Sequence, residues 1–144
     1  MTMTREDRDH LWDHFKFNAD QRIKAFNFFV VLSGFANGAV FAAYEKKFAL
    51  PLLAAIGVLI IVLALVFAVI DQRSRNLTRL SVPGLKQFEA ECESLTSDEF
   101  KVFTMDAKNA PLLVRYTTAF SLLYCVQAAF GVAVVLYAAG HISF

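Results

Sequence analysis

The hydrophobic and polar positions divide the chain into three long uncharged runs separated by charged stretches. The runs cover residues 25–44, 48–70 and 116–140. Each is close to or above the ~20 helical residues that cross ~30 Å of hydrocarbon. The alternative is a set of buried helices in a soluble core, which three such runs in one chain of 144 residues disfavour. The pattern therefore predicts an all-α integral membrane protein with three transmembrane helices, at 25–44, 48–70 and 112–140.

Composition agrees with this class. The chain is 57% hydrophobic with a mean hydropathy of +0.49, above the values typical of a soluble domain. A cleaved signal peptide is excluded for the first run, because the residues before it form a long segment with several acids rather than a short basic one. The first run is therefore expected to be a retained span.

Residues 1–24 are predicted to form an amphipathic helix that leads into the first span. Leu11, Phe15, Ala19 and Ile23 recur at helical spacing, and neither Gly nor Pro separates them from the span. Two forms fit this pattern. One is a single long helix that projects from the membrane, and the other is an interfacial helix bent at the membrane surface.

The connections between spans differ in length. The sequence YEKK at 44–47 allows only a tight hairpin, so the first two spans are expected to be antiparallel neighbours. The second connection, 71–111, is expected to be a short helical segment. There VPG at 82–84 is predicted to end one helix, and Thr96 with Glu99 matches a capping box that would start another. Residues 141–144 are left as a tail.

The basic residues are distributed unevenly around the spans. Twelve of the 14 lysines and arginines lie before the first span or between the second and third, and only Lys46 and Lys47 lie in the first connection. The positive-inside rule then predicts a bacterial inner-membrane protein with a cytoplasmic N-terminus and segment 71–111, and a periplasmic C-terminus.

The spans contain small and polar residues that lipid contact alone does not explain. Helices in lipid associate through close packing and interhelical hydrogen bonds. The candidates for packing or oligomer contacts are Gly34, Gly38, Ala42, Gly57 and Gly131. The candidates for interhelical hydrogen bonds, or alternatively for lining a pore, are Asn27, Ser33, Asn37, Ser121 and Gln127. Because a single three-helix unit does not readily satisfy this many amides, we expect a homo-oligomer.

Chemistry beyond packing has few candidates. The charged residues nearest the membrane, Asp71 and Arg115, sit at span ends, and the lack of charge deeper in the spans disfavours a coupled transporter. His10 and His14 have metal-ligand spacing but lack the companions of a metal motif. We expect no catalytic residues, metal or cofactor. The arginines after the second span, Arg73, Arg75 and Arg79, are candidates for contacts with lipid headgroups or a nucleotide. Nucleic acid is not an expected partner.

The run FNADQRIKAFNFFVVLSG, residues 17–34, resembles the entry into the first span of small bacterial multi-pass membrane proteins. These are the oligomeric RipA-like group and the two- to four-span effectors of anti-phage operons, including a CRISPR-associated membrane accessory. The resemblance implies a multimeric membrane protein that perturbs the membrane when a cytoplasmic partner activates it. The leading hypothesis is an oligomeric effector or pore-like protein in stress or anti-phage defence. The alternative is a non-conducting scaffold or accessory subunit that docks a cytoplasmic protein.

Overall fold

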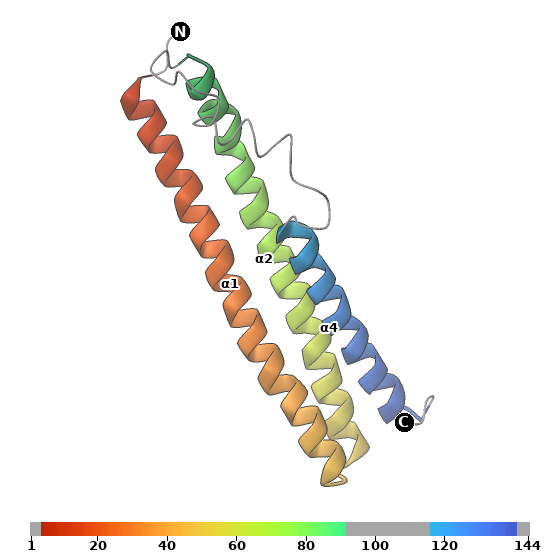
Figure 1. Cartoon of the computed structure of the whole chain (residues 1–144). Coiled ribbons are helices and arrows are strands. Elements are labelled where there is room, and N and C mark those ends of the chain that lie inside the picture. Colours follow the sequence, from red (N-terminus) through yellow and green to blue (C-terminus); the bar gives the residue numbers. More distant parts are fainter. Residues whose placement is uncertain (1–3, 92–115, 141–144) are drawn as a thin grey trace.

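The computed structural model describes residues 4–91 and 116–140, which form three helices and no strand (Figure 1). They are α1 (Arg5–Glu45), α2 (Leu50–Glu91) and α4 (Tyr116–Ala138). All three are long and apolar enough to cross a membrane. The predicted fold class, an all-α membrane protein with three spanning helices, is confirmed.

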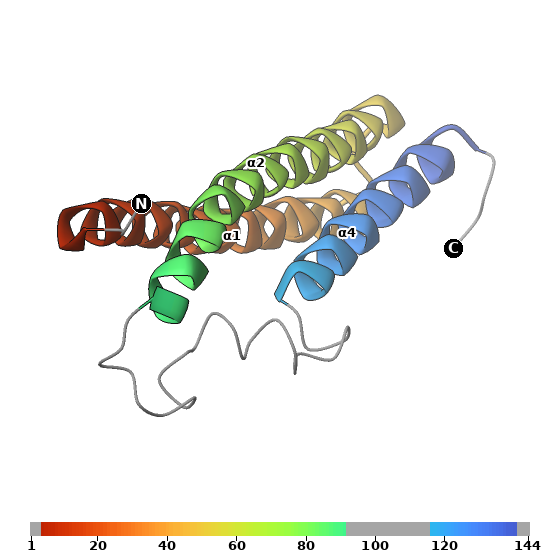
Figure 2. The ribbon, with the colours of Figure 1, turned by 90° about the horizontal axis from the view of Figure 1, so that it is seen from above.

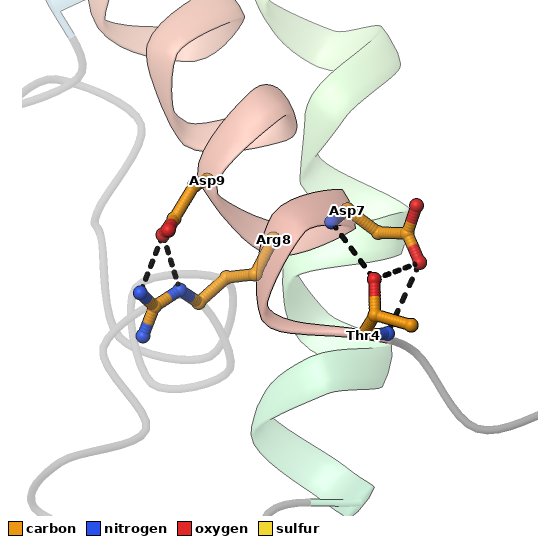
Figure 3. A network of polar contacts seen from close by, with 4 residues as sticks. All are labelled: Thr4, Asp7, Arg8 and Asp9. Atoms are coloured by element: carbon orange, nitrogen blue, oxygen red, sulfur yellow. Dashed lines mark hydrogen bonds and ion pairs between the residues drawn. The ribbon is translucent and has the colours of Figure 1, made fainter.

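The start of α1 is fixed by a reciprocal cap (Figure 3). The Asp7 N–H donates to Thr4 Oγ1 at 3.2 Å, and the Thr4 N–H donates to Asp7 Oδ2 at 3.0 Å. Arg8 adds an exposed ion pair with Asp9. The Asp7 carboxyl accepts hydrogen bonds from the Thr4 hydroxyl, which has the larger effect, and from the Thr4 backbone N–H. Both hold the pKa of this carboxyl below its ordinary value. Two N–H groups that a helix start leaves unsatisfied are thereby paired.

The turn between α1 and α2 closes with a Schellman motif. The Phe48 N–H donates to the Ala43 carbonyl at 2.9 Å and the Lys47 N–H donates to the Tyr44 carbonyl at 3.1 Å. Lys47 takes the left-handed conformation, φ 51°, that the motif requires and that glycine usually supplies. Pro51 lies in the first turn of α2, where a missing N–H costs nothing.

Helices α1 and α2 run antiparallel beside one another, as Figure 1 shows. With 41 and 42 residues, each is about 60 Å long, roughly twice the hydrocarbon thickness. The uncharged parts, 25–44 and 48–70, match the hydrocarbon thickness, and we call the remaining parts of the two helices, residues 5–24 and 71–91, the stalk. Helix α1 is thus one continuous helix in the structure, the first of the two forms that the sequence allows.

The buried seam of α2 changes character between membrane and stalk. Its buried residues recur at spacings of mostly three, four and seven: Leu53, Gly57, Ile60, Ala64, Asp71, Ser74, Ser81, Leu85 and Glu89. The part inside the membrane is apolar, whereas most of the stalk part is polar. The fully buried residues of α2 are therefore more polar in the stalk than in the span, and hydrogen bonds worth about 1 kcal/mol each contribute to the pairing of the stalk helices.

The predicted break at VPG is wrong. Helix α2 continues through Pro83 to Glu91, and Figure 2 shows its last turns bending away from the direction of the rest. Proline removes one backbone hydrogen bond and kinks a helix without having to end it. Ser81 and Leu85, on either side of Pro83, are both buried, and this packing favours a helix that continues through the proline. The capping box predicted at Thr96 lies outside the described residues.

Helix α4 packs mainly on α2. An added Cβ at Gly57 would lie 3.0 Å from the Gly131 carbonyl oxygen, and one at Gly131 would lie 2.9 Å from the Gly57 carbonyl oxygen. Only glycine allows the two backbones this close. Helices α1 and α4 are instead bridged by large side chains. Phe26 and Phe120 stack with ring centroids 3.8 Å apart, and Phe29 meets Tyr124 edge-on at 4.7 Å.

Candidate functional site

The main polar contact inside the membrane joins α1 to α4. Asn37 Nδ2 donates to Gln127 Oε1 at 3.3 Å, and Gln127 Nε2 donates to Asn37 Oδ1 at 2.7 Å. Gln127 is buried and Asn37 half-buried. The two amides thus satisfy one another within a single chain, and they need neither water nor a second subunit to do so.

The remaining polar candidates lie apart from this pair. Ser33 is buried, and its Oγ has no hydrogen-bond partner among the described residues. Asn27 and Ser121 are exposed, on α1 and α4 respectively. Ser33 lies one turn from Asn37 on the same side of α1, whereas Asn27 and Ser121 are exposed, so the five side chains predicted to bond between helices or line a pore do not form one continuous lining in the single chain.

The small residues fall into two groups that the sequence does not distinguish. Gly57 and Gly131 form the crossing of α2 and α4. Gly34, Gly38 and Ala42 are exposed, and no described atom lies within 4 Å of a Cβ added at either glycine.

These three exposed residues, with Asn27, define what we call the outer face of α1. Helical spacing places all four on the side of α1 opposite Ala36, Val40 and Ala43, the buried residues that pack toward α2. The outer face is thus a strip of small side chains with one exposed amide at its stalk end.

A buried ion pair lies where the stalk meets the membrane. Arg22 Nε donates to Asp71 Oδ1 at 2.6 Å and a terminal nitrogen of Arg22 donates to Oδ2 at 3.3 Å. The side chains are only 17% and 6% exposed. The guanidinium also lies over the Phe120 ring, 5.0 Å from its centroid. One cluster therefore ties all three helices together at this depth.

Sequence reasoning missed this pair, although a signal for it exists. Arg22 precedes Lys46 by 24 residues and Asp71 follows Lys47 by 24 residues. In an antiparallel hairpin that folds between these lysines, the two charges lie at the same depth, where an ion pair between the helices can form. Asp71 is therefore part of the helix-packing interface as well as the end of the second span.

Further from the membrane, the stalk contains a second polar layer. His14 Nδ1 lies 2.7 Å from Ser81 Oγ, and Asn18 Nδ2 donates to the His14 carbonyl at 2.8 Å. Asn18 and Ser81 are 5% and 1% exposed. His14 is thus part of the contact between α1 and α2, whereas His10 is exposed. Within residues 4–91 and 116–140, no three His, Cys, Asp or Glu side chains come together as a metal site.

The three arginines after the second span do not form one patch. Arg73 and Arg79 are exposed, while Arg75 is partly buried and its Nε has no hydrogen-bond partner in the described part of the chain. Helical spacing puts Arg75 and Arg79 one turn apart on one side of α2 and Arg73 on another side.

Comparison with known proteins gives one informative match. No protein-family model and no solved structure matches the chain. Among curated proteins, the chain is similar to CD-NTase-associated protein 19 of Escherichia coli, with 21% identity over 123 residues. The aligned part covers 85% of this chain and 80% of that protein. The likeness thus extends along most of both chains, at an identity that assigns no family.

Proposed function

We propose that this chain is the membrane component of an anti-phage defence system, an oligomeric effector that alters membrane integrity or potential. Three spanning helices support its place in a membrane. The name of the similar protein, which associates it with a CD-NTase, is compatible with anti-phage defence. The observation that carries the oligomeric part of the proposal is the outer face of α1.

The outer face has the two properties that favour association of helices in lipid. Gly34 and Gly38 have nothing described within 4 Å of an added Cβ, so a second helix can approach their backbone closely. Asn27 exposes an amide at the same face, and an amide in contact with hydrocarbon is costly. A second copy of α1 packed here would fill the open space beside Gly34 and Gly38 and would cover the Asn27 amide.

The amide pair removes part of the support for a homo-oligomer that came from the number of amides in the spans. Asn37 and Gln127 satisfy one another inside the subunit, so neither requires a second copy. Asn27 is left as the spanning amide that favours one. For Asn37 and Gln127 to line a water-filled path, the contact between α1 and α4 would have to open when the effector is activated.

The test compares two leucine substitutions on α1. Gly38→Leu blocks close approach at the outer face, while Ala39→Leu adds the same bulk at an exposed position that points elsewhere. We expect Gly38→Leu to reduce the size of the complex in mild detergent and to abolish depolarisation in cells that overproduce the chain with its operon partners. Ala39→Leu should do neither. If Gly38→Leu leaves both properties unchanged, the outer face is not the subunit contact.

A second candidate function is a non-conducting accessory subunit that docks another protein on the stalk. The stalk supports it with large apolar side chains outside the membrane, since Phe17 is 61% and Leu80 70% exposed. In this case, overproduction should not depolarise cells. Phe17→Glu and Leu80→Glu should instead release the partner. The size of the homo-oligomer, purified without the partner, should not change. Neither proposed role is enzymatic.

The proposed orientation has the stalk in the cytoplasm and the α1–α2 turn in the periplasm of a bacterial inner membrane. Its support is the excess of basic residues on the stalk side, twelve against two. Reporter fusions after Phe144 and after Ser94 should report opposite sides. If both fusions report one side, the chain does not cross the membrane three times.

A further inference from the structure

A cleft opens between α1 and α4 at the end of the spans nearest the turn. One buried aliphatic residue from each helix forms its floor: Val40, Leu53 and Val134, which are 7%, 4% and 2% exposed. Phe41 and Tyr44 line one wall, and Phe130 and Tyr137 line the other. Its volume is about 260 Å³. Phe41 and Tyr44 are 64% and 50% exposed, so the cleft faces outward toward the bilayer.

The cleft follows from how the helices pack. Phe41 and Phe130 have ring centroids 6.3 Å apart, and those of Tyr44 and Tyr137 are 5.8 Å apart. At the stalk end the same two helices are joined by a stacked aromatic pair at 3.8 Å. The aromatic pairs thus bridge α1 and α4 over an aliphatic floor, and the cleft lies among these side chains.

A second hollow continues the cleft to the membrane boundary. It has a volume of about 430 Å³ and shares Tyr44, Leu53 and Tyr137 with the first. Its other lining includes Glu45 and Lys47 of the turn. The combined space is therefore apolar within the membrane and charged where the chain leaves it. Two tyrosines stand at the junction, which is the depth that tyrosine favours in a bilayer.

We propose that these two adjoining hollows form a binding site for one anionic phospholipid, with an acyl chain in the cleft and the phosphate beside Lys47, the basic residue that lines the second hollow. The charged residues that line the hollow, Glu45 and Lys47, balance one another, and the neighbouring Lys46 brings the turn to a net charge of +1, which favours an anionic over a zwitterionic headgroup. The apolar cleft excludes water, and its opening toward the bilayer gives acyl chains direct access. The site depends on the membrane setting of the chain and not on the proposed effector role.

The first test locates the acyl chain on the unmodified protein. The full chain is reconstituted with phosphatidylglycerol that carries a photoreactive group near the end of one acyl chain, and the crosslinked residues are mapped. We expect adducts concentrated at residues 40–44 and 130–137. Equal labelling of the exposed α2 residues Val58 and Val62 would overturn the proposal, because it would mean that lipid contacts all faces alike.

The second test separates headgroup from acyl chain. Native mass spectrometry counts the lipids that the purified chain retains from phosphatidylglycerol or phosphatidylcholine with identical acyl chains. Lys46→Gln and Lys47→Gln should each reduce retention of phosphatidylglycerol about fivefold and leave phosphatidylcholine unchanged. Val40→Phe should fill the cleft and reduce both, while Val58→Phe on the exposed side of α2 reduces neither. Equal retention of the two lipids by the unmodified chain would overturn the headgroup assignment.

Discussion

The amide pair between α1 and α4 makes a quantitative prediction about stability in the membrane. Replacing Asn37 with Leu removes two hydrogen bonds, which in membrane proteins average about 0.6 kcal/mol each. It also leaves the buried Gln127 amide without its partner, which costs a further ~1–3 kcal/mol. We expect Asn37→Leu to destabilise the helix assembly by about 2–4 kcal/mol, and Gln127→Met to do the same.

The double variant distinguishes a mutual pair from two independent amides. With both amides replaced by apolar side chains of similar volume, no polar group is left unpaired and the loss should fall to about 1 kcal/mol. The coupling energy, which is the sum of the two single losses minus the loss in the double variant, is then about 3 kcal/mol at the lower costs and about 7 kcal/mol at the upper ones. Ser121→Ala, at an exposed position on α4, serves as the control and should change stability little.

The assay is reversible unfolding in mixed micelles, in which increasing fractions of sodium dodecyl sulfate disrupt the packed helices. The free energy of unfolding is measured for the unmodified chain, both single variants and the double variant. A coupling energy within about 0.5 kcal/mol of zero would refute the pairing. If the singles keep full stability but lose depolarising activity in cells, the amides act on water or ions rather than on one another.

Other contacts give sharper local predictions. Gly57→Ala would place a Cβ 2.8 Å from a Val135 methyl and should destabilise α2–α4 packing by about 1–3 kcal/mol, whereas Gly34→Ala should be nearly neutral; thermal unfolding in detergent checks both. Asp71→Asn leaves the Arg22 guanidinium buried without a counter-charge and should cost about 3–5 kcal/mol in the same measurement. Because the pKa of Asp7 is lower in the folded chain, its cap stabilises the start of α1 at pH values above the pKa of Asp7 in the unfolded chain. This stabilisation is lost as the pH falls through the pKa of the folded chain. Amide exchange in the first turn should therefore accelerate with acid, and Asp7→Asn should remove that pH dependence.

The periodicity of apolar residues predicts the helices and the turn well, because lipid imposes length and hydrophobicity on each span. The sequence wrongly predicts a helix end at Pro83, because helix propensity does not include the burial of the residues on both sides of the proline. It also cannot separate Gly34 from Gly57. Both belong to stripes of small residues, and only the direction of the neighbouring helix decides which one is covered.

Pairings between side chains that are distant in the sequence are harder still to predict from the sequence. The sequence marks Asn37 and Gln127 as polar groups in spans but leaves open whether they face a pore, another subunit or one another. The rotation of each helix about its axis decides this, and large aromatic residues such as Phe26 and Phe120 set that rotation. The Arg22–Asp71 pair was partly within reach of the sequence, because the hairpin register places the two residues at the same depth.

Both helices of the hairpin cross the membrane surface without a joint. No Gly or Pro occurs in α1 between Arg5 and Ser33, and none occurs in α2 between Val58 and Val82. Helix α1 along the stalk, and α2 as far as its bend at Pro83, are therefore continuous rods that run into the spans, and the Arg22–Asp71 pair joins the two helices at the start of the spans. A lateral displacement of about 5 Å at the stalk tip, about 30 Å from the membrane, corresponds to a tilt of about 10°. A force on the stalk part of α1, or on α2 between Pro83 and the span, thus reaches the spans as a change of tilt, because no Gly or Pro interrupts either helix there.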